Sequence, residues 1–372
     1  MSVKTKAAVL KGLQQDFEIV ELDLEDPREN EVLVRMKVAG LCHSDKHVKF
    51  GGVRLPLVCG HEGAGIVEKI GPGVTDLAVG DHVAVSWIPE CGRCQWCRRG
   101  MGNLCDLGAA MTTGELMSGG FRFRDGDGVE YSSQAGLGTF SQYLVASTHS
   151  LVKVDPSIPW EWVSLVTCGV TTGWGSVINV GKVKAGDSVA IYGCGGIGAN
   201  AVLAAIQANA GLVGVIEPVE WKRGVAAKWG ADAVYATAEE AHADMWERTH
   251  GAGVDVSVVA VGVVHADVVG QAFELTRKGG QIVLVGVSDD FTEASIQVPG
   301  SALTLFQKSI TGSLFGACVP HVHVPMLLGM AKAGKLRLDE LVTSRYRLDQ
   351  VNQGFTDMLA GKNLRGVIVF DD

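Results

Sequence analysis

The sequence predicts an α/β protein in which a doubly wound parallel sheet is joined to a second, mainly β domain. Residues 3–150 contain short stretches in which apolar and polar residues alternate between Gly- and Pro-containing turns, and this alternation indicates strands with one buried face. From about residue 170, strands rich in Val and Ile alternate with Ala-rich helices, which is typical of a parallel sheet covered on both faces. We therefore expect one domain at 170–314 and another that combines 1–169 with 315–372.

In the mainly β part, strands are expected where the period-two alternation is clearest, at 32–38, 66–70 and 82–85. The segment 106–135 is polar and rich in glycine, and we expect it to form a long surface loop.

In the second domain, strands and helices are expected to follow one another along the chain. Its strands are expected at 188–193, 212–217, 233–236, 254–261 and 281–286, with 309–314 as the last strand of the sheet. Its helices are expected at 197–210, 219–229 and 239–250, with one more that ends at 278.

Composition and charge exclude several classes of function. The chain has 372 residues, 47% of them hydrophobic, which is enough for two cores. Its net charge of −9 argues against a surface for nucleic acid or for anionic membranes. We find no apolar run of the length that a signal peptide or a membrane span needs, so a cytoplasmic location is expected. The nine cysteines would then be reduced thiols, which favours metal binding over disulfides.

Four cysteines lie close together in one loop, at Cys91, Cys94, Cys97 and Cys105. This spacing predicts a closed tetrahedral Zn²⁺ site in which all four positions are filled by protein. Such a site holds part of the fold together and does no chemistry. The alternative is a group of packed or oxidisable thiols.

A second set of zinc-type ligands is dispersed along the chain, and consists of Cys42, His61 with its neighbour Glu62, and Cys168. Each is a weak signal by itself, because a single Cys or His is usually a core residue. Only the tertiary fold could bring them together. A site with three protein ligands leaves one position open for substrate, so the two sets together indicate a zinc enzyme.

The segment 193–198 fits the G-x-G-x-x-G pattern of a dinucleotide-binding loop. It closes one expected strand and opens one expected helix, and Glu217 ends the next strand; in this context the pattern is specific for a dinucleotide whose pyrophosphate lies at the helix N-terminus. The Glu217 carboxylate can accept hydrogen bonds from a ribose diol and would repel a 2′-phosphate, so we predict NAD rather than NADP. The loop residues are Gly193, Gly195, Gly196, Ile197 and Gly198.

Taken in order, these motifs resemble those of the zinc-dependent medium-chain alcohol dehydrogenases over essentially the whole chain. The segments that begin at Cys105, Val170 and Leu275 look most like those of the bacterial nicotinoprotein (NDMA-dependent) alcohol dehydrogenases. The resemblance implies a GroES-like catalytic domain and a Rossmann domain. It also implies reversible hydride transfer between NAD and a small-molecule substrate, a primary alcohol (aliphatic or aromatic) or its aldehyde.

The resemblance assigns the dispersed set to a catalytic zinc, with Cys42, His61 and Cys168 as ligands and Glu62 behind the metal as a transient ligand. Asp45 would orient the zinc histidine. With the four-cysteine loop, the chain would carry two Zn²⁺ ions. The catalytic ion would lower the pKa of the alcohol hydroxyl, and hydride would pass to the nicotinamide.

The resemblance also implies a path for the alcohol proton, to Ser44 and then through the cofactor ribose to His47. The alternatives are a helix N-cap for Ser44 and a solvated imidazole for His47. Further residues are implied to contact the cofactor, with His43 standing where many relatives carry arginine at the pyrophosphate. They are His43, Thr172, Lys222, Val287 and Arg365.

The substrate pocket is assigned by resemblance alone. Trp87 matches the aromatic position that forms one wall of the pocket, with core packing as the alternative. Val53, Leu314 and Val287 would line the same pocket.

Two other functions would share some of these features. A glutathione- or other thiol-dependent formaldehyde dehydrogenase would share the motifs, but those relatives carry an arginine four residues after the last structural cysteine, where this chain has Ala109. A non-catalytic scaffold or DNA-binding zinc module is disfavoured by the acidic charge and by the dispersed set.

Two expectations concern the assembled enzyme. Kinship with the nicotinoprotein branch predicts that NAD(H) stays bound, in which case an external electron acceptor must reoxidise it between turnovers. The expected last strand, 309–314, would leave an exposed sheet edge, so we predict a homodimer or homotetramer.

Overall fold

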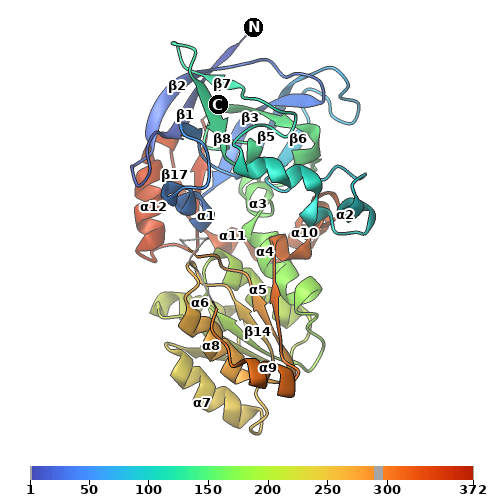
Figure 1. Cartoon of the computed structure of the whole chain (residues 1–372), viewed down its shortest axis with the longest axis vertical. Coiled ribbons are helices and arrows are strands. Elements are labelled where there is room, and N and C mark those ends of the chain that lie inside the picture. The colour runs from blue at the N-terminus through green and yellow to red at the C-terminus, as the bar shows by residue number, and fades with distance from the viewer. Residues whose placement is uncertain (1, 289–295, 372) are drawn as a thin grey trace. The chain divides into compact units, whose positions relative to one another are not determined.

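The computed structural model describes residues 2–288 and 296–371. The chain divides into two compact units, the first formed by Met1–Cys168 with Val319–Asp372 and the second by Gly169–Cys318 (Figure 1). The expected boundaries lay after residues 169 and 314. None of the described helices has the length and apolar character that a membrane span requires.

The first unit contains a small closed barrel and a seven-stranded sheet. The barrel strands are, in spatial order, β1 (Val3–Leu10), β2 (Glu18–Leu24), β7 (Phe123–Arg124), β8 (Glu130–Ser133) and β4 (Leu57–Val58). The sheet strands are, in order, β10 (Leu151–Lys153), β6 (His82–Ser86), β5 (Glu62–Ile70), β3 (Glu31–Gly40), β18 (Arg365–Val369) and β17 (Val342–Tyr346), with β9 (Tyr143–Ser147) also paired to β3.

Short helices connect these strands. They are α1 (His43–His47), α2 (Gln95–Arg98), α3 (Trp160–Leu165), α10 (Pro320–Lys332), α11 (Leu338–Leu341) and α12 (Val351–Leu359).

The core of the first unit joins the start of the chain to its end. Phe17 lies with its ring 5.2 Å from that of Phe355 in α12 and 6.5 Å from that of Phe140. All three side chains are buried in the cluster that also contains the apolar side of β3. The alternation predicted for β3 is confirmed in its middle, where the half-buried Arg35 and Lys37 flank the buried Met36.

The expectation of a long surface loop at 106–135 is wrong. This segment contributes β7 and β8 to the barrel, and Leu116, Arg122 and Phe123 are almost completely buried. The Arg122 guanidinium bonds to the buried Glu31 carboxylate, with Nε 3.0 Å from Oε2. Strands of two and four residues are too short to show a hydrophobic period. The polar composition of the segment also indicates exposure, although one of its charged side chains forms a buried ion pair. The sequence pattern could therefore not indicate this packing.

The second unit is a six-stranded parallel sheet with helices arranged around it (Figure 1). Its strands are, in spatial order, β13 (Ala233–Tyr235), β12 (Leu212–Ile216), β11 (Ser188–Tyr192), β14 (Val254–Val259), β15 (Thr276–Leu284) and β16 (Ser309–Gly312). Its helices are α4 (Gly169–Gly175), α5 (Gly196–Gln207), α6 (Glu220–Trp229), α7 (Ala238–Arg248), α8 (Ala266–Leu275) and α9 (Gly300–Leu305).

The order of the strands is that of a Rossmann domain, because it reverses at β11, whose neighbours are β12 and β14. The prediction of a doubly wound parallel sheet is confirmed. The helix expected to reach residue 278 ends at Leu275, since β15 already begins at Thr276.

Candidate metal centres and dinucleotide loop

The dispersed ligand set comes together inside the first unit. Cys42, His61, Glu62 and Cys168 are buried and each offers a ligand atom, all within 4.8 Å of one another. Pairing of β3 with β5 brings the end of one strand beside the start of the next, with Ala39 opposite Gly63 in register. Cys42 therefore lies near His61 and Glu62, and α3, which packs against both strands, delivers Cys168.

Glu62 has one carboxylate oxygen available for a cation. Its Oε2 bonds to the Arg365 guanidinium. Its Oε1 is buried, has no hydrogen-bond partner among the described residues, and lies 3.9 Å from His61 Nε2. Gly40 is required beside it, because a Cβ there would lie 2.1 Å from Oε2. Burial raises the pKa of Glu62, although the charge of Arg365 opposes the shift.

The two thiols of the set are coupled. The hydrogen bond from Cys168, together with one from His61, holds the pKa of Cys42 well below its ordinary value. The hydrogen bond to Cys42 and burial raise the pKa of Cys168. The pair thus favours one thiolate and one thiol, and a divalent cation would displace the remaining proton. Two sulfurs, an imidazole and a nearby carboxylate form a donor set that fits zinc.

Asp45 determines which nitrogen of His61 can bind a metal. Its Oδ1 lies 2.6 Å from His61 Nδ1. Burial lowers the pKa of His61, but the Asp45 charge outweighs it and raises that pKa well above the ordinary value. Because a carboxylate only accepts, Nδ1 carries the proton and Nε2 faces the other ligands. Trp87 packs edge-on against the imidazole, with ring centroids 6.0 Å apart.

The two relay candidates lie on α1 next to Cys42. Ser44 Oγ is 3.7 Å from Cys42 Sγ and is exposed. The helix N-cap is Cys42, so the N-cap alternative for Ser44 does not hold. His47 is only 4% exposed, which also excludes a solvated imidazole, and its ring lies 5.9 Å from that of His43.

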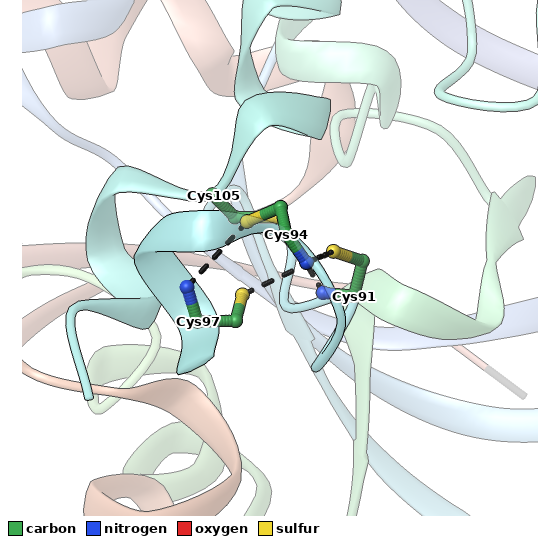
Figure 2. A group of neighbouring side chains, drawn as sticks. All are labelled: Cys91, Cys94, Cys97 and Cys105. Carbon is green, nitrogen blue, oxygen red and sulfur yellow. Dashed lines mark hydrogen bonds between the residues drawn. The ribbon is translucent and has the colours of Figure 1, made fainter. Parts of the chain in front are cut away.

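The four cysteines of the second set face one another around the short helix α2 (Figure 2). Backbone N–H groups of these cysteines donate to the sulfurs of other cysteines in the set. The nitrogen of Cys94 lies 3.3 Å from Cys91 Sγ, and that of Cys97 lies 3.5 Å from Cys94 Sγ. Backbone N–H groups of Cys97 and Asp106 lower the pKa of Cys94 to about 6, whereas burial raises that of Cys105 to about 12. N–H donors that face sulfur stabilise thiolates, so this set also fits zinc.

The 193–198 loop has the backbone that a pyrophosphate needs. Gly193 has a φ of 90°, and Gly195 is the N-cap of α5. A Cβ on Gly198 would lie 1.9 Å from the Gly193 carbonyl oxygen. A Cβ on Gly195 would have no heavy atom within 4 Å, so there is open space at the start of α5, where helix N–H groups can bind phosphate. Gly173 of α4 packs equally closely, since a Cβ there would lie 2.2 Å from the Ile197 carbonyl.

Glu217 lies directly after β12 and is 6% exposed. Its Oε2 accepts the Cys194 N–H at 2.8 Å and its Oε1 the Val219 N–H at 2.9 Å. These bonds hold the carboxylate beside the 193–198 loop. Lys222, on the next helix, is also largely buried, at 9% exposed.

The remaining predicted residues are divided between the two units. In the second unit, Thr172 is buried in α4, and Val287 and Leu314 are 40% and 42% exposed. In the first unit, Val53 and Trp87 pack on the hydrophobic core. Arg365, which the resemblance assigns to the pyrophosphate, makes its ion pair with Glu62.

Two residues beside the dispersed set, Gly40 and Gln134, were not predicted as site residues. Gly40 looked like any strand-ending glycine. Gln134, which bonds to Asp45, lies in the segment expected to be a surface loop.

Two family models match the chain. One, described as an alcohol dehydrogenase GroES-like domain, covers residues 28–156, and the other, described as a zinc-binding dehydrogenase, covers residues 196–329. These matches and the geometry define a zinc-binding dehydrogenase built from a GroES-like and a Rossmann domain.

Individual relatives agree over nearly the whole length. The NDMA-dependent alcohol dehydrogenase of Amycolatopsis methanolica is 46% identical and covers 99% of each chain. Alcohol dehydrogenase B of Mycobacterium tuberculosis is 44% identical over all of this chain and 99% of the relative. The crystal structure of benzyl alcohol dehydrogenase from Acinetobacter calcoaceticus has a TM-score of 0.91 at 30% identity, over 99% of this chain and all of that one. The chain therefore belongs to the zinc-dependent medium-chain alcohol dehydrogenases. It is an NAD-dependent oxidoreductase that acts on alcohols.

Proposed function

We propose that the chain binds two zinc ions and oxidises primary alcohols, or reduces their aldehydes, at the dispersed set. The observation that carries the proposal is the meeting of four buried ligands from positions 42 to 168 within 4.8 Å. Cys42, His61 and Cys168 would hold the catalytic ion, with Glu62 as a transient ligand. The four-cysteine loop would hold a structural ion.

The protein's own residues would prepare and then deprotonate the alcohol. Bound zinc supplies a Lewis acid and NAD a hydride acceptor. Asp45 would accept the proton on Nδ1 of His61 and so leave Nε2 as the nitrogen that faces the metal, while Arg365 holds one oxygen of Glu62 and the other can reach the metal. Ser44, exposed beside Cys42, accepts the alcohol proton, and His47 on the same helix passes it on.

The proposals for the cofactor and for the substrate class are supported by residues of the second unit and by similarity to named relatives. The bare loop at 193–198 would receive the pyrophosphate, with His43, Thr172, Lys222, Val287 and Arg365 as further contacts. Glu217 would select NAD. By resemblance, Trp87 and Val53 of the first unit and Leu314 of the second are proposed as substrate contacts, and the name of the solved benzyl alcohol dehydrogenase makes aromatic alcohols the first substrates to test.

We further propose that NAD(H) remains bound between turnovers, as the name of the NDMA-dependent relative suggests. An external electron acceptor would then reoxidise the cofactor. A cytoplasmic location is proposed too, because six of the nine cysteines lie in the two candidate metal sites and thiols that bind metal rather than form disulfides are typical of that compartment.

One experiment tests these points together. Native mass spectrometry of protein purified without added cofactor should show two zinc ions and one NAD(H) per chain. Turnover of benzyl alcohol should rise greatly with an artificial acceptor such as NDMA and little with added NAD. Protein that purifies empty, with a rate that saturates in NAD, would make this an ordinary exchanging dehydrogenase. S-hydroxymethylglutathione belongs in the same assay, and the thiol-dependent alternative predicts that it outperforms every simple alcohol.

We also propose that a second copy pairs with the outer edge of β16, the last strand of this sheet among the described residues. This strand ends the sheet order, and Leu305 just before it is 77% exposed. An exposed edge is a template for strand pairing. A sedimentation mass above 39.2 kDa at micromolar concentration is expected, and a single-chain mass would contradict the proposal.

A further inference from the structure

Gln134 is a buried amide beside the dispersed set that no motif in the sequence marks. It opens a short turn after β8, η4 (Gln134–Gly136), and is 6% exposed. The backbone carbonyl oxygen of Gln134 accepts hydrogen bonds from the N–H groups of Leu137 at 3.0 Å and Gly138 at 3.2 Å. The next residue, Ala135, has a φ of 54°, a left-handed conformation that costs free energy for a residue other than glycine. The chain thus holds this side chain in place through a strained turn.

The orientation of the Gln134 amide follows from its neighbours. Its Oε1 lies 2.8 Å from the Gly60 backbone nitrogen. A backbone N–H can only donate, so the oxygen must face Gly60 and the NH₂ group must face the other way. There, Nε2 donates to Asp45 Oδ1 at 2.9 Å.

Asp45 is therefore held by three donors. The Oδ1 atom receives Gln134 Nε2 and, at 2.6 Å, His61 Nδ1. The Oδ2 atom receives the Cys42 N–H at 3.0 Å. Asp45 is completely buried, so none of these bonds is exchanged with bulk water. Removing one donor would let the carboxylate rotate or shift toward the remaining two.

Gln134 acts on His61 from two sides. Through Asp45 it orients the imidazole ring, and through Gly60 it holds the backbone one residue before His61. Because Gln134 and His61 share the same oxygen, the Gln134 bond also withdraws electron density that Asp45 would otherwise offer to the imidazole N–H.

We infer that Gln134 is a positioning residue for the metal-binding histidine, and that it connects the 106–135 segment to the dispersed metal centre. The inference rests on the proposed function in one respect, namely that the dispersed set binds zinc. Groups that orient a metal-binding histidine typically change metal affinity or activity about 10- to 100-fold when they are removed.

The test uses Gln134→Met, which keeps the length of the side chain and removes both amide groups. Transfer of zinc to a chelator should resolve two release rates, one for each metal site. The ion of the dispersed set should leave about 10- to 100-fold faster in the variant than in the wild type. The four-cysteine ion should leave at the wild-type rate, which would show that the variant is folded. The Co²⁺-substituted enzyme should show shifted d–d bands, which a loss of stability alone would not produce.

Gln142→Met is the matched control. The Gln142 amide oxygen also accepts a backbone N–H, that of Lys6 at 3.1 Å, but on the surface. It should release both classes of zinc at the wild-type rate. If Gln134→Met does not fold, Gln134→Asn, whose shorter amide cannot reach both partners, should show the same accelerated release.

A double-mutant cycle with Asp45→Asn separates the route through Asp45 from that through Gly60. If Gln134 works through Asp45, its substitution should accelerate zinc release much less when Asp45 is already altered. Equal acceleration in both backgrounds overturns that route. Wild-type release and Co²⁺ bands in Gln134→Met would overturn the inference and leave the proposed function standing. A wild-type enzyme without zinc in the dispersed set would instead overturn the proposed function.

Discussion

The two cysteine-containing clusters of the first unit differ in how the chain assembles them. In the 91–105 loop, all four side chains come from one segment, and the backbone of that segment donates to its own sulfurs. In the dispersed set, the side chains come from the ends of β3 and β5 and from beyond α3. They are oriented by Asp45, and by Arg365, which lies 303 residues from Glu62 along the chain.

This difference in assembly corresponds to a difference in the chemistry that each site can support. A loop that supplies four sulfurs and its own N–H donors closes around an ion and leaves no open position. A set built from separate strands can mix donor types, bury them completely and keep one carboxylate oxygen in reserve. The cost is dependence on buried charges that must all be paired.

The largest effect is expected from Cys168→Ser. It should abolish zinc binding at the dispersed set and retain the four-cysteine ion. The variant therefore separates the contributions of the two metal sites. Loss of a Lewis acid worth several kcal/mol lowers turnover on the order of 10³-fold. Metal analysis and kcat test this. Cys59→Ser is the control, because Cys59 is a buried thiol that belongs to neither candidate metal site and donates to the Leu57 carbonyl. Two retained zinc ions with normal turnover would refute the assignment.

Cys105→Ser probes the local cluster. The serine hydroxyl can still accept the Cys91 N–H that Cys105 Sγ accepts at 3.4 Å, so the change isolates loss of the metal. We expect unfolding free energy to fall by about 3–5 kcal/mol, with turnover per folded molecule nearly unchanged. Chemical denaturation with parallel zinc analysis measures both. A large fall in kcat at unchanged stability would contradict a purely structural role.

Arg122→Met tests the buried ion pair of the segment that carries Gln134. It leaves the Glu31 carboxylate buried and without its charged partner, which should lower the free energy of unfolding by about 3–5 kcal/mol. Burial alone would raise the pKa of Glu31, but hydrogen bonds from Arg122 and Ser118 lower it. The pair therefore stabilises the wild type above about pH 4, and this contribution is lost as pH falls through the lowered pKa.

The stability gap between wild type and Arg122→Met should thus narrow on acidification. Urea unfolding from pH 7 to pH 3 measures it, with Arg124→Met, whose partners Glu25 and Glu130 are half-exposed, as the surface control. A gap that is constant with pH would show that Glu31 is not the charged partner.

The smallest effect is expected from Glu217→Ala. Two charges 4 Å apart repel by about 1–4 kcal/mol between water and an effective dielectric of 20, so the wild type should bind NAD at least about fivefold more tightly than NADP. The variant should lose most of that preference. Binding to cofactor-stripped protein is the measurement, since a retained cofactor would mask it. Equal affinity of the wild type for both would refute the role.

Local patterns determined much of this protein. The four-cysteine spacing, the glycine pattern after β11 and the alternation of Val-rich strands with helices are properties of short segments, and each reflects a geometry that neighbouring residues impose on one another. They sufficed to predict a parallel sheet covered by helices on both faces, the loop that fits NAD and the four-cysteine metal site.

Only the tertiary structure decided how the dispersed set is assembled and supported. The register of β3 against β5 brings Cys42 to His61, and the approach of Glu62 to Gly40 leaves room for no side chain there. Arg122 and Gln134 looked like surface residues because single-sequence patterns report average exposure. They are buried because each meets a charged partner from a distant strand or helix, Glu31 for one and Asp45 for the other. Such pairings between distant segments leave no periodic trace in the sequence.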